Sequence, residues 1–158
     1  MRISNPYKYS NGYIFLPLRN LNLDNLHPTI VLFGDNYYLK SEFHVSLICV
    51  KEALRENPLI TEANIVDIFN GFVGKISLQK VEYLDEYRIA THPDGRKSII
   101  QKVNIRGVEG LFTELRKKIH ITINTQPLHV TIYTLQGDRG IGISNIEDYN
   151  NTLEIRFR

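Results

Sequence analysis

Two segments of the chain carry the same kinds of side chain at the same spacing. The segments are FHVSLI at 43–48 and LHVTIY at 128–133. Side chains alternate between the two faces of an extended strand, so His44 and Ser46 share one face, and His129 and Thr131 share the equivalent face of the second segment. Imidazoles exchange protons near neutral pH, and hydroxyls hydrogen-bond phosphate oxygens. If the two strands lie side by side, two imidazoles and two hydroxyls surround one space that suits a phosphate group.

Composition predicts an ordinary globular protein that forms a single domain over residues 1–158. The chain has 42% hydrophobic and 23% charged residues, and its formal net charge is +2. Such a small net charge argues against a duplex DNA partner, which is normally gripped by a strongly basic face. A small anionic ligand is compatible with this charge.

Several features predict a cytoplasmic protein with no membrane partner. The single cysteine, Cys49, cannot form an internal disulfide and lies in an apolar run, which favours a reducing compartment. The first eight residues lack the apolar core of a secretory signal, and no later segment approaches the ~18 consecutive apolar residues of a membrane span.

In the first half of the chain, strands are expected to precede helices. Apolar runs rich in β-branched and aromatic residues predict strands at 13–18, 29–33 and 42–49. The third of these carries the first histidine motif and continues into a short helix at 51–56, which Pro58 ends. Thr61 is a suitable N-cap for a longer helix whose apolar residues form one buried stripe before Gly74.

In the second half, the expected order is a hairpin, a helix, the second histidine strand and a short C-terminal unit. Strands are predicted at 75–84, 86–91, 97–103, 128–133 and 153–157. A turn at 93–95 joins two of them, and an amphipathic helix is expected at 106–119. A glycine-bearing loop at 136–143 leads to a short helix opened by a capping box of Ser144 and Glu147. Since the histidine strands lie about half a chain apart, we expect two similar lobes around one cleft.

The paired His-apolar-Ser/Thr-apolar segments resemble the two-histidine phosphoesterase superfamily, which includes the bacterial RNA 2′,3′-cyclic phosphodiesterases once called 2′-5′ RNA ligases. The resemblance implies an α+β, bilobal fold in which two antiparallel sheets line a central cleft and helices cover the outside. Members generally work without a metal ion or other cofactor. By position, His44 and His129 would act in acid-base catalysis, and Ser46 and Thr131 would contact the phosphate.

The sequence therefore predicts a metal-independent phosphodiesterase that hydrolyses a 2′,3′-cyclic phosphate, at an RNA end or on a nucleotide, or a related 2′-5′ linkage. One histidine must start neutral and the other protonated for base and acid catalysis. We assign His129 as base and His44 as acid, and the reverse assignment stays open. The alternatives are a non-catalytic nucleotide- or RNA-binding module of the same fold, and a structural protein in which the four residues do not meet.

Further residues are candidates for substrate contact. Tyr133 shares the strand face of His129 under simple alternation, and Arg139 in the glycine-bearing loop could reach a substrate anion. The basic hairpin tip at 92–97 would guide RNA if it overhangs the groove. A zinc site is disfavoured, because no cysteine lies near either motif and Glu42 has no matching carboxylate beside His129.

Overall fold

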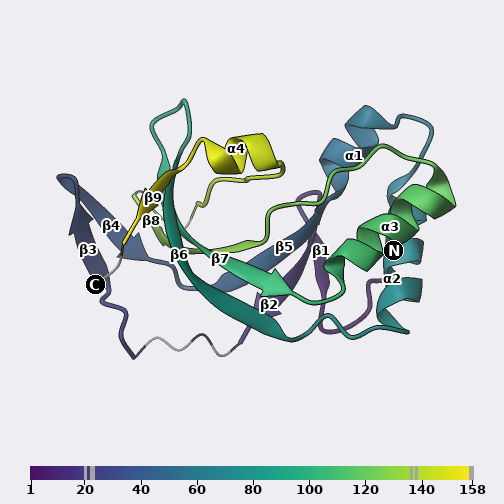
Figure 1. The fold of residues 1–158 in the computed structure, drawn as a ribbon, viewed down its shortest axis with the longest axis horizontal. Coiled ribbons are helices and arrows are strands. Elements are labelled where there is room, and N and C mark those ends of the chain that lie inside the picture. Colours follow the sequence, from purple (N-terminus) through teal and green to yellow (C-terminus); the bar gives the residue numbers. More distant parts are fainter. Residues whose placement is uncertain (20, 22–23, 136, 138, 157–158) are drawn as a thin grey trace.

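The computed structural model describes residues 1–19, 21, 24–135, 137 and 139–156, and these form an α+β fold with a large antiparallel sheet and four helices (Figure 1). The strands are β1 (Lys8–Ser10), β2 (Tyr13–Leu18), β3 (Thr29–Leu32), β4 (Asp35–Leu39), β5 (Phe43–Cys49), β6 (Val81–Thr91), β7 (Lys97–Ile105), β8 (His129–Thr134) and β9 (Leu153–Ile155). The helices are α1 (Val50–Glu56), α2 (Glu62–Val73), α3 (Val108–Ile119) and α4 (Ile146–Asn150). No helix of the described part is long and apolar enough to cross a membrane.

The strands of the described residues join into one sheet. Its main order is β1-β2-β5-β8-β7-β6-β9, and β4 pairs with both β3 and β8. We expected two separate sheets, but β5 and β8 pair directly at Val45 and Val130, and this contact connects the two halves of the chain. The histidine strands are therefore neighbours at the centre of a continuous sheet.

One face of the sheet is packed against the longer helices. The apolar residues of the histidine motifs, such as Val45 and Val130, are fully buried in a cluster that includes Phe69 of α2 and Phe112 of α3. The predicted start of α2 is confirmed, because the Thr61 side chain accepts a hydrogen bond from the backbone N–H three residues later. Burial of this face leaves the polar face of both motifs pointing away from the main core.

The β3–β4 hairpin contains a strand that the sequence did not predict. Asp35 and Asn36 are typical turn residues, yet they begin β4. The turn lies one step earlier, at Phe33 and Gly34, whose φ angles of 51° and 82° match a two-residue hairpin turn. A bulky residue at a positive φ is uncommon, which is why sequence patterns place this turn elsewhere.

Three other boundaries differ from the predictions. The segments 75–84 and 86–91 were predicted as two strands, but from Val81 they form the single strand β6 with a register shift. The short helix α4 is capped by Asn145, whose side chain accepts from the Asp148 N–H at 2.8 Å, rather than by Ser144. The predicted strand 153–157 ends at Ile155 in the described residues, and position 157 lies outside them.

Candidate active site

The register of the sheet brings the two histidine motifs together. Val45 lies opposite Val130 in an antiparallel pair, so His44 is opposite Thr131 and Ser46 is opposite His129. The two histidines are then diagonal neighbours on one face, a relation in which residues lie about 7–8 Å apart. Each motif therefore places its hydroxyl beside the histidine of the other motif.

All four motif side chains line one pocket of about 640 Å³. Its floor is the polar face of β2, β5 and β8, and its rim includes the β1–β2 turn and residues 139–143. The structure thus brings together His44, Ser46, His129 and Thr131, the four residues that the sequence selected. Such a volume accommodates a nucleotide-sized molecule.

Tyr133 is not brought to this pocket. In the β7–β8 register, Ile99 pairs with Tyr133 and Ile100 with Thr131, so Ile132 is an extra residue on β8. Such a bulge interrupts strict alternation, and both Ile132 and Tyr133 belong to the buried core. The Tyr133 hydroxyl donates to the His27 carbonyl at 2.9 Å. Simple alternation therefore placed Tyr133 on the wrong face.

The same irregularity occurs at the same motif position in β5. There Ile14 pairs with Ile48 and Phe15 with Ser46, which makes Leu47 the extra residue. Leu47 and Ile48 are both fully buried, just as their counterparts are in β8. Each motif strand thus has a bulge directly after its hydroxyl residue, so the two segments are alike in backbone geometry as well as in residue type.

The pocket is rich in positive charge. Among the residues that the structure describes, the lining includes the cationic side chains of Lys40, Lys51, Arg96 and Arg139 and one carboxylate, that of Glu42. This balance favours an anionic ligand. Arg139 was a candidate from the sequence, but Lys40 and Lys51 were not identified, because no pattern in the sequence links them to the motifs.

The hairpin between β6 and β7 contributes one residue to the pocket. Arg96 lines it, donates to Asp94 Oδ2 at 2.7 Å and donates to the Gly140 carbonyl at 3.2 Å. His92 contacts Asp94 at 2.9 Å and Lys97 forms an ion pair with Asp35, and neither His92 nor Lys97 lines the pocket. Of the basic hairpin tip, Arg96 is therefore the residue that reaches the site.

His129 is held in a defined tautomer. Its Nδ1 lies 2.8 Å from the Pro127 carbonyl oxygen, and because a carbonyl only accepts hydrogen bonds, Nδ1 carries the proton. In the neutral ring, Nε2 is then free to accept a proton. The imidazole is 8% exposed, and desolvation by burial lowers its pKa, although the Pro127 hydrogen bond acts in the opposite direction.

His44 is the more exposed of the two imidazoles. Its pKa is also lowered, first by desolvation in the pocket and then by the charge of Lys40, while Glu42 raises it. Phe15 from β2 packs beside the ring, with 5.0 Å between the ring centroids. The Glu42 carboxylate thus favours the protonated form of His44. The pKa of His129 is instead set by burial, the Pro127 hydrogen bond and the charge of His44.

Residues 139–143 cross the polar face of the sheet with their backbone close to the pocket residues. A Cβ atom added to Gly142 would lie 2.9 Å from the Tyr13 hydroxyl, so any other residue at this position would require the Tyr13 side chain to shift. Ile141 and Ile143 are buried in a small cluster with Ile100 and Tyr149. This cluster holds the rim of the pocket against β7.

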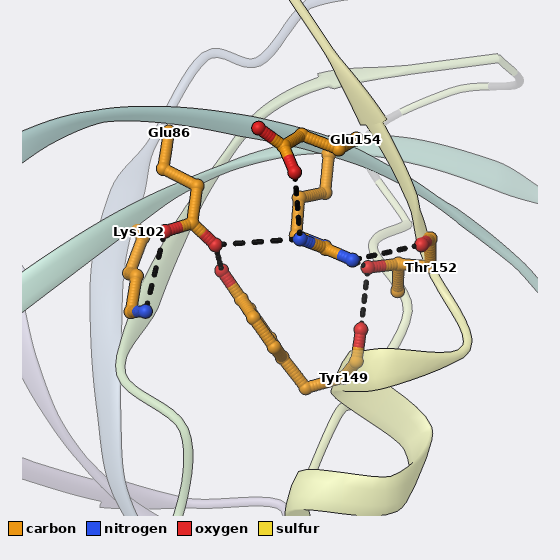
Figure 2. A network of polar contacts seen from close by, with 6 residues as sticks. Glu86, Lys102, Tyr149, Thr152 and Glu154 are labelled. Atoms are coloured by element: carbon orange, nitrogen blue, oxygen red, sulfur yellow. Dashed lines mark hydrogen bonds and ion pairs between the residues drawn. The ribbon is translucent and has the colours of Figure 1, made fainter.

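A polar network fixes the helix that follows this rim (Figure 2). The Tyr149 hydroxyl of α4 donates to Glu86 of β6 at 2.7 Å, and Lys102 of β7 contacts the same carboxylate at 3.2 Å. Arg88 donates to the Thr152 hydroxyl at 2.6 Å. The Tyr149 hydrogen bond is the main cause of the lowered pKa of Glu86. The network therefore fastens α4 to the edge of the sheet.

We expect Tyr149→Phe to lower the free energy of unfolding by about 1.5–3 kcal/mol, because the hydrogen bond that it removes is accepted by a charged group. Denaturant unfolding followed by circular dichroism measures this change. Tyr83→Phe is the matched control, since Tyr83 is 41% exposed and its change should stay within about 0.5 kcal/mol. Equal stabilities of the two variants would contradict this role of Tyr149.

The charged groups of the pocket suit an anion better than a metal ion. Among the described residues, no group of three or more His, Cys, Asp or Glu side chains is arranged to hold a metal. The cationic side chains that share the pocket with both histidines would repel a metal cation.

Comparisons with protein-family models, with curated proteins and with solved structures found no match for this chain.

Proposed function

We propose that this protein is a phosphodiesterase that opens a 2′,3′-cyclic phosphate, at an RNA end or on a nucleotide, or cleaves a related 2′-5′ linkage. The observation that carries the proposal is that both motif histidines and both motif hydroxyls line a single cation-rich pocket. A structural protein with coincidental motifs has no need of this convergence. The two titrating groups also go beyond what phosphate binding alone requires.

The proposed reaction uses the two imidazoles in opposite roles. Neutral His129 takes a proton from water at Nε2 while the water oxygen attacks phosphorus. Protonated His44 gives its proton to the departing sugar oxygen as the P–O bond breaks, which leaves a phosphate monoester and a free hydroxyl. The burial and fixed tautomer of His129 favour the base role, and the carboxylate near His44 favours the acid role.

The hydroxyls of Ser46 and Thr131 are proposed to donate hydrogen bonds to the non-bridging oxygens. Groups placed in advance around a phosphorus atom stabilise the charge that develops there without reorganisation during the reaction. Lys40, Lys51 and Arg139 supplement this effect through their charge. The repeated bulges of β5 and β8 also support the proposal that the molecule has two related lobes meeting at this pocket.

Product analysis tests the proposed reaction directly. The purified protein is incubated with 2′,3′-cyclic nucleotides, with RNA carrying a 2′,3′-cyclic end and with 2′-5′ linked dinucleotides, each with and without chelator. We expect hydrolysis that the chelator does not reduce, and the position of the product phosphate identifies the departing oxygen. Saturable nucleotide binding without any product would instead support the non-catalytic binding module.

The rate should show a bell-shaped pH dependence, because one imidazole must be neutral and the other protonated. Burial lowers the pKa of both rings in the free protein, so the bell for kcat/KM should lie on the acidic side of the ordinary histidine value near 6.5. A bound phosphate anion favours the protonated rings and raises both pKa values. The bell for kcat should therefore lie at higher pH, and coincident profiles would contradict this assignment.

A further inference from the structure

Gln126 is a buried pocket residue whose side-chain amide has no hydrogen-bond partner in the described part of the chain. Its side chain lines the same pocket as the motif residues and is 4% exposed. The Oε1 atom is closed off from solvent and has no hydrogen-bond partner among the described residues. Since nearly all buried polar groups in folded proteins are hydrogen-bonded, this unpaired acceptor indicates that Gln126 is not retained for a hydrogen bond within the described fold.

Gln101 shows what an amide with a structural role looks like in this fold. Its Nε2 donates to the Leu84 carbonyl at 3.0 Å and so connects β7 to β6 at the irregular part of that pair. Gln126 has no such contact, although it is the more buried of the two side chains. Its polarity lowers the stability of the fold, since an apolar side chain of the same size would leave no unpaired acceptor there.

Gln126 lies close in the chain to the proposed base, His129. The next residue, Pro127, accepts the hydrogen bond that orients His129. Gln126 also lines a small cavity of about 20 Å³ together with Cys49, the last residue of β5, and a cavity of about 280 Å³ together with Leu128. These contacts place its amide where β5 ends and β8 begins, which is the end of the pocket where Ser46 lies opposite His129.

We propose that Gln126 is a further phosphate-contacting residue, whose Nε2 donates a hydrogen bond to a non-bridging oxygen of the bound phosphate ester. Because Oε1 is the closed-off end of the amide, the NH2 group is the end that remains for the pocket. An amide NH2 only donates, and a phosphate diester oxygen only accepts, so the two groups match. The identity of the ligand rests on the proposed function.

Gln126→Leu separates this contact from a structural role. The substitution removes both the donor and the unpaired acceptor while keeping a similar volume. We expect the melting temperature to rise by about 2–6 °C, and kcat/KM for the cyclic phosphate to fall by about 10²-fold. Affinity for a nucleoside 3′-monophosphate and for inorganic phosphate, measured by calorimetry, should fall in parallel.

Two further variants sharpen the test. Gln126→Glu keeps the shape but replaces the donor with a carboxylate that repels phosphate, so its kcat/KM should fall below that of Gln126→Leu. Gln101→Leu is the control, and it should lower the melting temperature without changing turnover or phosphate affinity. Gln126→Leu that keeps wild-type turnover and phosphate affinity would overturn the inference while leaving the proposed function intact.

The binding measurements also work if the enzyme hypothesis fails. A wild-type protein that hydrolyses none of the substrates but binds nucleoside monophosphates refutes the catalytic proposal alone. In that case, weaker binding by Gln126→Leu still supports the contact, and unchanged binding overturns it.

Discussion

Replacing His129 or His44 by alanine is expected to lower kcat/KM for a 2′,3′-cyclic phosphate by a factor of about 10²–10⁴. Each substitution removes one of the two proposed proton transfers, since His129 is the proposed base and His44 the proposed acid. Substrate affinity should change much less, because the hydroxyls and cations of the pocket remain. Single-turnover kinetics with a cyclic nucleotide separate the chemical step from binding.

A variant that combines His44→Ala with His129→Ala tests whether the two imidazoles act in the same step. Two groups that act in one concerted proton relay give strongly non-additive losses, so the double variant should be little slower than the slower single variant. His120→Asn is the control, because His120 ends α3 at a φ of 50° that asparagine tolerates, and it lies outside the pocket lining. Full activity after either motif substitution would remove the basis of the proposed reaction.

Removing one motif hydroxyl is expected to lower kcat by a factor of about 10²–10³, the usual effect of losing one preorganised donor to a developing oxyanion. Ser46→Ala and Thr131→Val are the relevant changes, since both keep a side chain of fitting size. The effect should fall mainly on kcat rather than on KM, because the hydrogen bonds strengthen as charge builds on the phosphate. Steady-state kinetics across substrate concentrations measure both parameters.

Exchange of one hydroxyl residue for the other is the matched control. Ser46→Thr and Thr131→Ser keep the donor and change one methyl group, so each should recover most of the lost rate. Equal losses in Thr131→Ser and Thr131→Val would show that packing, rather than the hydroxyl, is responsible. This control is necessary because Ile132, the next residue of β8, is buried. A change of side-chain shape at position 131 therefore also affects the packing of the strand.

The strand face that each motif histidine shares with its hydroxyl could be predicted because the signal is local. Alternation in a short strand sets which face His44, Ser46, His129 and Thr131 share, and the pocket lining agrees with it. The start of α2 at Thr61 was equally local, since a capping residue and an apolar stripe occur within a few positions. Features that depend on one segment alone are therefore the ones that sequence patterns specify.

The remaining features depend on pairing between distant segments. The misplacement of Tyr133 follows from the bulge at Ile132, which exists only through the register with β7. The single sheet follows from the contact of Val45 with Val130. Gln126 could not be selected from the sequence, because the feature that distinguishes it is an unpaired side-chain oxygen, which only the structure reveals.

The contact between β5 and β8 has a mechanical consequence. It is defined by one residue pair in the described sheet, whereas β6 and β7 share eight. The spacing of the two imidazoles therefore depends on this one pair together with the β4–β8 pairs at Tyr38 and Leu39. Sliding of β5 along β8 would alter the alignment of the proposed proton donor and acceptor, so the proposed catalysis should respond to deformation earlier than unfolding does.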